Sequence, residues 1–123
     1  MPEKAELLEK LIESCDAIFY LKDEEGRFLF VNRAFEEAFQ LEAGEAIGQD
    51  DFLIGSKEQA DAWRSLDDQV RTTGQPATAE STVALPSGEK TLLDHKFAVS
   101  GIEGAPRAVG GIAIEVPAGA QPA

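Results

Sequence analysis

The side chains best suited to catalysis or metal binding are scarce in this chain of 123 residues. It has one histidine, His95, and one cysteine, Cys15, too few for a multi-histidine or cysteine-rich metal site or for an internal disulfide. Asp94 adjoins His95, but neighbours along a strand point to opposite faces and do not converge on one substrate atom. The sequence also lacks a glycine-rich phosphate-binding loop. We therefore expect no metal site and no enzymatic activity.

Three polar or aromatic side chains remain candidates for binding a ligand. His95 alternates with Leu93 and Phe97 on a predicted strand, where its imidazole either contacts a ligand in a pH-sensitive way or packs in the core with one hydrogen bond. Trp63 either offers its indole N–H to a ligand or simply packs. Ser81, on an otherwise apolar strand face, either meets a polar group of a ligand or bonds to the backbone. The sequence leaves each pair of alternatives open.

The elements that must position these side chains follow from apolar periodicity and from turn residues. Apolar residues at helical spacing predict helices over 3–15, 33–41 and 57–73. Asn32 is expected to begin the second of these, and Ser56 and Gly74 to bound the third. Strands are predicted over 17–22, 27–31, 77–85, 90–99 and 108–116, with a loop over 100–107. This order predicts an α+β fold in which helices cover one face of a five-stranded, mainly antiparallel sheet.

The helix over 57–73 bounds the expected ligand pocket. Its apolar stripe is expected to face the sheet, because the sheet is the only large apolar surface available to it. A cleft with mostly apolar walls and a few polar groups is the usual form of a small-molecule site. The pair Gly110-Gly111 in the last strand either makes room for a ligand or marks a bulge. The candidate pocket residues are Trp63, Leu66, Val70, Ser81, His95 and Phe97.

The helix over 3–15 is amphipathic, and its apolar stripe needs a partner. The strands over 17–22 and 27–31 are apolar on both faces, which calls for a second cover besides the other helices. Either the chain's own first helix or a second copy of the chain provides it. We expect a parallel homodimer through Leu8, Leu11, Ile12 and Cys15.

The charge balance excludes two classes of partner. Lysine and arginine number 11 against 23 aspartates and glutamates, so the net charge is −12. Such a chain is repelled by nucleic-acid phosphates and by an anionic membrane surface, and no apolar run reaches the ~20 residues of a membrane span. We therefore expect neither nucleic acid nor membrane as a partner. The single cysteine and the lack of a secretory signal favour the reducing cytoplasm.

Several stretches taken together resemble the PAS domain, a sensory module of bacterial signal-transduction proteins. They are AIFYLKDEEGRFLFVNRAF, EAIGQDDF, DDQVRTTGQPATAE, PSGEKTLLDHKF and RAVGGIAIEV, in the family's order and spacing. The resemblance implies a PAS-like core over 17–116, and the amphipathic helix over 1–16 resembles the leader that often precedes such a core. The Pro/Gly/Ala-rich composition of 117–123 favours a flexible tail or severed linker. Pro117 departs from the family pattern, because it discourages a helix directly after the last strand.

The resemblance further implies a sensory function. A small molecule is expected between the long helix and the sheet, with the signal passing through a dimer and flanking helices to an effector such as a kinase, cyclase or transcription regulator. Ligand-free homodimerisation or signal relay is the alternative. The cofactor is left open, but haem and flavin are not expected. Haem-binding members often use a histidine on the long helix and flavin photosensors a cysteine in the helical middle, and this sequence has neither there.

Overall fold

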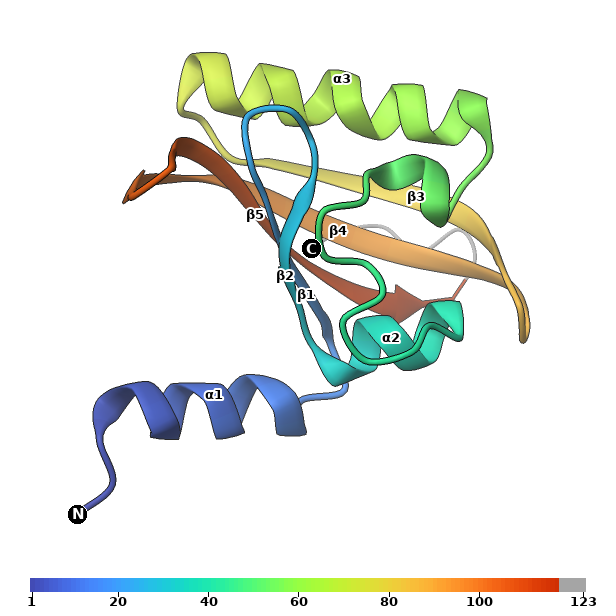
Figure 1. Ribbon diagram of the computed structural model, residues 1–123. Coiled ribbons are helices and arrows are strands. Elements are labelled where there is room, and N and C mark those ends of the chain that lie inside the picture. Colours follow the sequence, from blue (N-terminus) through green and yellow to red (C-terminus); the bar gives the residue numbers. More distant parts are fainter. Residues whose placement is uncertain (118–123) are drawn as a thin grey trace.

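The predicted α+β fold is confirmed by a computed structural model, which describes residues 1–117. Five antiparallel strands form one sheet in the order β2-β1-β5-β4-β3. Helix α3 and the segment around α2 cover one face of this sheet (Figure 1). The elements are α1 Lys4–Ser14, β1 Ile18–Lys22, β2 Phe28–Val31, α2 Arg33–Phe39, a 3-10 turn η1 Asp51–Leu53, α3 Lys57–Thr73, β3 Ala77–Leu85, β4 Gly88–Ile102 and β5 Ala105–Val116.

The predicted caps fix the ends of the two core helices. The Ser56 hydroxyl accepts a hydrogen bond from the Gln59 backbone N–H at 3.2 Å and begins α3. Gly74 ends that helix in the left-handed conformation, with φ of 72°. Asn32 begins α2, where its Oδ1 accepts from the Phe35 N–H at 3.1 Å. These polar residues therefore determine where the helices start and stop along the sheet.

The predicted loop over 100–107 is wrong. Strand β4 continues to Ile102, and β5 begins at Ala105, so the two strands form one long hairpin with Ile102 opposite Ala105. The segment 100–107 is rich in glycine and other small residues, a composition that is typical of loops. Gly101 and Gly104, with φ of 82° and 81°, instead supply the backbone conformations of a tight, twisted turn.

One face of the sheet carries the core. Residues paired across an antiparallel ladder point to the same side, and the pairs Ile18–Ala113 and Ala113–Asp94 define the side that faces the helices. The buried apolar residues on and above this face form one cluster: Ile18, Tyr20, Phe28, Val31, Ala34, Phe35, Ala46, Val83, Leu92 and Ala113. The helices therefore close over a single core.

The glycine pair in β5 makes room for aromatic rings on both faces of the sheet. A Cβ atom on Gly111 would lie 2.0 Å from Cζ of Tyr20 on the core face, and one on Gly110 would lie 2.8 Å from a ring carbon of Phe97 on the other face. The sequence left open whether the glycine pair makes room for a ligand or marks a bulge. The pair makes room, but the rings of Tyr20 and Phe97 fill it.

Helix α1 stands away from the sheet (Figure 1). None of its residues is fully buried, and Leu8 and Leu11 are 47% and 67% exposed. Ile12 and Cys15 are half-buried where the helix meets the core. The apolar stripe predicted to mediate dimerisation is thus largely uncovered in the single chain.

Side chains of the core hold the C-terminal end of α1. The Asn32 amide donates to the carbonyl oxygens of Ile12 and Ala17 at 3.0 and 2.9 Å. Arg33 Nε donates to the carbonyl oxygen of Glu13 at 3.0 Å. The bonds to Ile12 and Glu13 reach carbonyl groups in the last turn of α1, where the intrahelical hydrogen bonds run out. Within residues 1–117, no helix is long and apolar enough to cross a membrane.

Replacing Gly111 by alanine is expected to lower the free energy of unfolding by about 1–3 kcal/mol, because the new methyl group collides with the buried Tyr20 ring. Gly110→Ala is the matched control on the same strand. It is expected to cost less, since Phe97 is only half-buried and has room to move. Urea unfolding of both variants measures the difference, and an equal or larger loss for Gly110→Ala contradicts the packing described.

Candidate functional site

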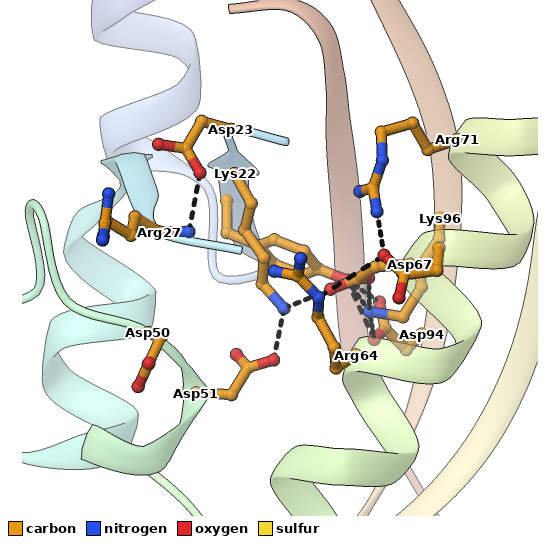
Figure 2. Close-up of polar contacts among 12 residues, drawn as sticks. Lys22, Asp23, Arg27, Asp50, Asp51, Arg64, Asp67, Arg71, Asp94 and Lys96 are labelled. Carbon is orange, nitrogen blue, oxygen red and sulfur yellow. Dashed lines mark hydrogen bonds and ion pairs between the residues drawn. The ribbon is translucent and has the colours of Figure 1, made fainter. Parts of the chain in front are cut away.

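A cluster of buried charged side chains lies between the sheet and α3. Lys22, at the end of β1, points its Nζ to Oδ2 of Asp51 at 2.6 Å and to Oδ2 of Asp67 at 2.8 Å (Figure 2). The exposed fractions of these three side chains are 3%, 8% and 2%. The Lys22 ammonium therefore joins β1, η1 and α3 in a place that water barely reaches.

A second lysine extends the cluster across the sheet. Lys96 Nζ, on β4, donates to the Tyr20 hydroxyl at 2.8 Å and lies 3.3 Å from Oδ2 of Asp94. It also lies 2.9 Å from Oδ1 of Asp67 as an ion pair without hydrogen-bond geometry, so this buried oxygen has no hydrogen bond within residues 1–117. Tyr20 in turn donates to the Asp94 carboxylate at 2.9 Å.

Local structure positions each member of the cluster. Lys22 and Tyr20 alternate on the core face of β1, and Lys96 and Asp94 do so on β4. Asp67 lies on the face of α3 that also carries Trp63 and Val70, because residues three and four apart share a helix face. Asp51 sits in η1, which begins where the Asp50 carboxylate accepts from the Phe52 N–H at 3.0 Å.

Burial and neighbouring charges shift the pKa values of three members. Desolvation, followed by the charge of Asp94, raises the pKa of Tyr20 well above its ordinary value of 10.0. Desolvation also raises the pKa of Asp51, and the nearby Lys22 opposes this only in part. Desolvation lowers the pKa of Lys96, but the carboxylates of Asp94 and Asp67 outweigh it, so the net shift is upward.

A small cavity of about 40 Å³ adjoins the cluster. Apolar side chains make most of its wall, and five members of the cluster make the rest. The residues that line it are Ile18, Tyr20, Lys22, Phe28, Phe35, Phe39, Asp51, Ile54, Trp63, Leu92, Asp94, Lys96 and Ala113. This combination of apolar walls and a few convergent polar groups is typical of a small-molecule site.

The candidate pocket residues of α3, and Ser81 on β3, lie where α3 faces the sheet, as predicted. Trp63 lines the cavity. Val70 is buried and Leu66 half-buried on α3, but neither belongs to the cavity wall. Ser81 pairs with Leu92 and so shares the core face, also outside the wall.

The prediction that His95 and Phe97 face α3 is wrong. His95 pairs with Ile112 and Phe97 with Gly110 on the opposite face of the sheet, and the His95 side chain is exposed, with its Nδ1 2.8 Å from the Thr78 hydroxyl. Strand β4 carries apolar residues on both faces, so its alternation did not reveal which face is covered. The apolar neighbours of His95 belong to the outer face.

The sequence interpretation missed the cluster because lysine and aspartate are ordinarily surface residues. One signal was present: Asp67 falls four residues after Trp63 and three before Val70, within the stripe predicted to face the sheet. A carboxylate in that position requires a cation opposite it. The lysines of the alternating strands were the available partners.

The members of the cluster interact with one another by hydrogen bonds and by charge. Within residues 1–117, no group of three or more histidine, cysteine, aspartate or glutamate side chains is placed to hold a metal ion. Three carboxylates face two ammonium groups, which gives a formal charge of −1. The arrangement is thus suited to holding a small polar group at the end of an apolar cavity.

Replacing Lys96 by methionine is expected to lower the free energy of unfolding by about 3–5 kcal/mol, because it leaves buried carboxylates without their cation. Lys90→Met, on the same strand, is the control. Lys90 pairs with Glu115 at 3.3 Å, but both side chains are substantially exposed, so the loss is expected to be about 0–1 kcal/mol. Thermal and urea unfolding test this contrast. Similar losses for the two variants contradict a buried ion pair at Lys96.

The phenol of Tyr20 is expected to stay protonated until the chain unfolds. Its pKa is raised in the folded state, so the folded chain retains a proton that the unfolded chain releases near pH 10.0. The stabilisation is therefore complete below that pH and is lost as the pH rises above it. Tyr20 is the only tyrosine, so tyrosinate absorbance and circular dichroism recorded together are a direct test. Tyrosinate formation near pH 10 in folded protein contradicts the buried phenol.

Solved structures of low sequence identity share this fold. The PAS domain of BvgS from Bordetella pertussis has a TM-score of 0.73 at 19% identity, covering 94% of this chain and 88% of that one. VqmA from Vibrio cholerae, in a complex with a ligand and DNA, has a TM-score of 0.80 at 19% identity, covering 93% of this chain and 51% of that one. The PAS domain of RpfR from Cronobacter turicensis, in complex with BDSF, has a TM-score of 0.70 at 20% identity, covering 84% and 96%.

The sequence comparisons extend this likeness. Protein y4lL of Sinorhizobium fredii, itself uncharacterized, is 32% identical over 85 residues, which are 69% of this chain and 10% of that protein. The chain thus spans about a tenth of the length of this curated relative. A family model for the PAS fold matches residues 12–118. The chain therefore belongs to the PAS family.

Proposed function

We propose that this PAS domain is a sensory module that binds a small molecule in the cavity between the sheet, α2, η1 and α3. The observation that carries the proposal is the contact between the apolar cavity and the buried charged cluster. Apolar walls supply binding free energy, and a few fixed polar groups supply orientation. Two of the structural neighbours are complexes of this general kind, VqmA bound to DPO and the RpfR PAS domain with BDSF.

The ligand enlarges the cavity when it binds. A volume of about 40 Å³ holds only a few water molecules, whereas small-molecule sites measure about 300–1,000 Å³. Trp63 and Phe39 line the cavity and are only half-buried, so they are the walls with room to move. Trp63 rests on Gly55, where a Cβ would lie 2.7 Å from its ring. Its displacement gives an incoming molecule its space.

The contacts of the cluster supply a route for the signal. A ligand that disturbs Asp51 or Lys22 acts at once on η1, β1 and α3. Strand β1 leads back directly to the end of α1, which Asn32 and Arg33 hold in place. We therefore propose α1 as the output element, acting on an effector domain of a longer protein in the cytoplasm. A binding role, rather than catalysis, fits carboxylates that are already engaged in ion pairs.

Homodimerisation is the second candidate function, with or without a ligand. It is favoured by the exposure of Leu8 and Leu11 on α1 and by half-buried apolar residues on the outer sheet face, among them Phe19, Phe97 and Ile112. A second copy of the chain that covers α1 removes this apolar surface from water.

Native mass spectrometry tests both candidates in one experiment. Protein from several expression hosts is expected to carry an added mass from a non-covalently bound molecule, which is absent under denaturing conditions. Because Trp63 lines the cavity, Trp63→Ala is expected to change the fraction of protein that keeps this added mass. The same spectra report the oligomeric state, and removal of residues 1–14 is expected to shift the chain toward the monomer. Repeatedly ligand-free dimer contradicts the ligand proposal and leaves the dimerisation module. A monomer at high concentration contradicts dimerisation.

A further inference from the structure

We propose, resting on the ligand site proposed above, that the cavity selects an uncharged molecule that carries a hydrogen-bond acceptor and donor side by side on a planar apolar body. It discriminates against organic anions and, more weakly, against cations. The charges, the free hydrogen-bonding groups and the aromatic faces of the cavity wall point separately to this class of ligand.

The charge of the cluster opposes an anion. Three aspartates, Asp51, Asp67 and Asp94, share two ammonium groups, so the cluster has a formal charge of −1. A further cation, Arg71, acts on Asp67 from outside the cavity wall. The cavity wall contains no arginine and no histidine. A carboxylate entering this poorly hydrated space adds a second unbalanced negative charge at close range, where the low dielectric makes repulsion strong. It also competes with internal carboxylates for the same lysine protons.

On the Lys22–Asp51 pair, one donor and one acceptor are not used between the two side chains. Lys22 Nζ has three N–H donors and uses two, on Asp51 Oδ2 and Asp67 Oδ2. Asp51 accepts the Lys22 hydrogen bond with Oδ2, which leaves its Oδ1 outside that bond. The two groups are joined through the contact of 2.6 Å between Lys22 and Asp51. A carboxamide, lactam or hydroxy-ketone presents the matching acceptor and donor on neighbouring atoms.

Two of the aromatic rings that could attract a cation, Tyr20 and Phe28, already face lysine ammonium groups. Lys22 Nζ lies 5.2 Å from the centroid of the Tyr20 ring and 5.3 Å from that of Phe28, and Lys96 Nζ lies 5.0 Å from that of Tyr20. A cationic ligand loses its hydration on entering this cavity, a cost that the single excess negative charge of the cluster offsets only in part. Phe35, Phe39 and Trp63 remain as flat apolar walls, which favours an uncharged planar body.

Three molecules of nearly the same shape test this selection: benzamide, benzoate and benzamidine. Each is titrated into the full chain, and the indole N–H signal of Trp63, the only tryptophan, reports binding by NMR. Benzamide is expected to bind at least about tenfold more tightly than benzoate, with benzamidine between them. Tighter binding of benzoate or benzamidine overturns the selection but leaves the ligand site. If no molecule of the series perturbs Trp63, the proposed ligand site itself is contradicted.

A charge-neutralising variant assigns the selection to the cluster. Asp51→Asn removes one negative charge and keeps an acceptor oxygen, so the preference for benzamide over benzoate is expected to narrow by about tenfold. Asp16→Asn changes the net charge equally at a fully exposed side chain and is expected to leave the preference unchanged. An equal effect of both variants overturns the assignment. If Asp51→Asn fails to fold, the titrations of the unsubstituted chain with the three molecules still test whether the cavity prefers an uncharged ligand.

Discussion

The buried ion pairs of Lys22 and Lys96 with Asp67 determine how helix α3 packs on the sheet. They tie β1 and β4, the two strands that flank the central β5, to helix α3, with side chains 2–3% exposed. Removing such charges from water costs several kcal/mol for each ion, which their attraction repays only in good geometry. A packed apolar core of the same volume gives comparable stability. A slip of α3 along the sheet would instead separate these ion pairs and leave buried charges without their partners.

The packing of α3 on the sheet gives the cavity two different ends. The ion pairs fix the polar end, whereas the far wall consists of aromatic side chains, two of them, Trp63 and Phe39, only half-buried. Under the proposed function, the rigid polar end recognises a ligand by its hydrogen bonds, and the adaptable apolar end accommodates its body by side-chain movement. Gly111 contributes from the opposite direction, because only its missing side chain lets Tyr20 lie across β5 and reach Asp94 and Lys96.

The helices and strands could be predicted from residues close together in the sequence. The residues of the candidate site could not, because strand pairing decides which face of β4 is buried. Ser56 and Gly74 bound α3 at the predicted positions because capping depends on hydrogen bonds within a few residues. The face of β4 was not predictable in the same way. Leu92 and Leu93 are adjacent and both at least half-buried, so only the register with β5 places Asp94 and Lys96 inside and His95 outside. Lysine is so rarely buried that a strand face carrying Asp94 and Lys96 is normally interpreted as exposed to solvent. The sequence interpretation therefore missed the cluster.

Two polar centres of the core differ in how completely their hydrogen-bonding groups are used, and this difference supports a structural role for one and the proposed binding role for the other. Asn32 uses its full capacity: Oδ1 accepts from Phe19 and Phe35, and Nδ2 donates to Ile12 and Ala17. Such a saturated group has nothing left for a ligand and locks α1, β1 and α2 together. The charged cluster keeps an unused Lys22 proton, and an Asp51 oxygen outside the Lys22 hydrogen bond, beside the cavity. Oδ1 of Asp67 also lacks a hydrogen bond, but it lies 2.9 Å from the Lys96 ammonium and is not part of the cavity wall. Under the proposed function, a ligand that uses the free groups stabilises one arrangement of β1. Because β1 begins where Asn32 holds the end of α1, we propose that this stabilisation reaches α1 through the backbone of one short strand.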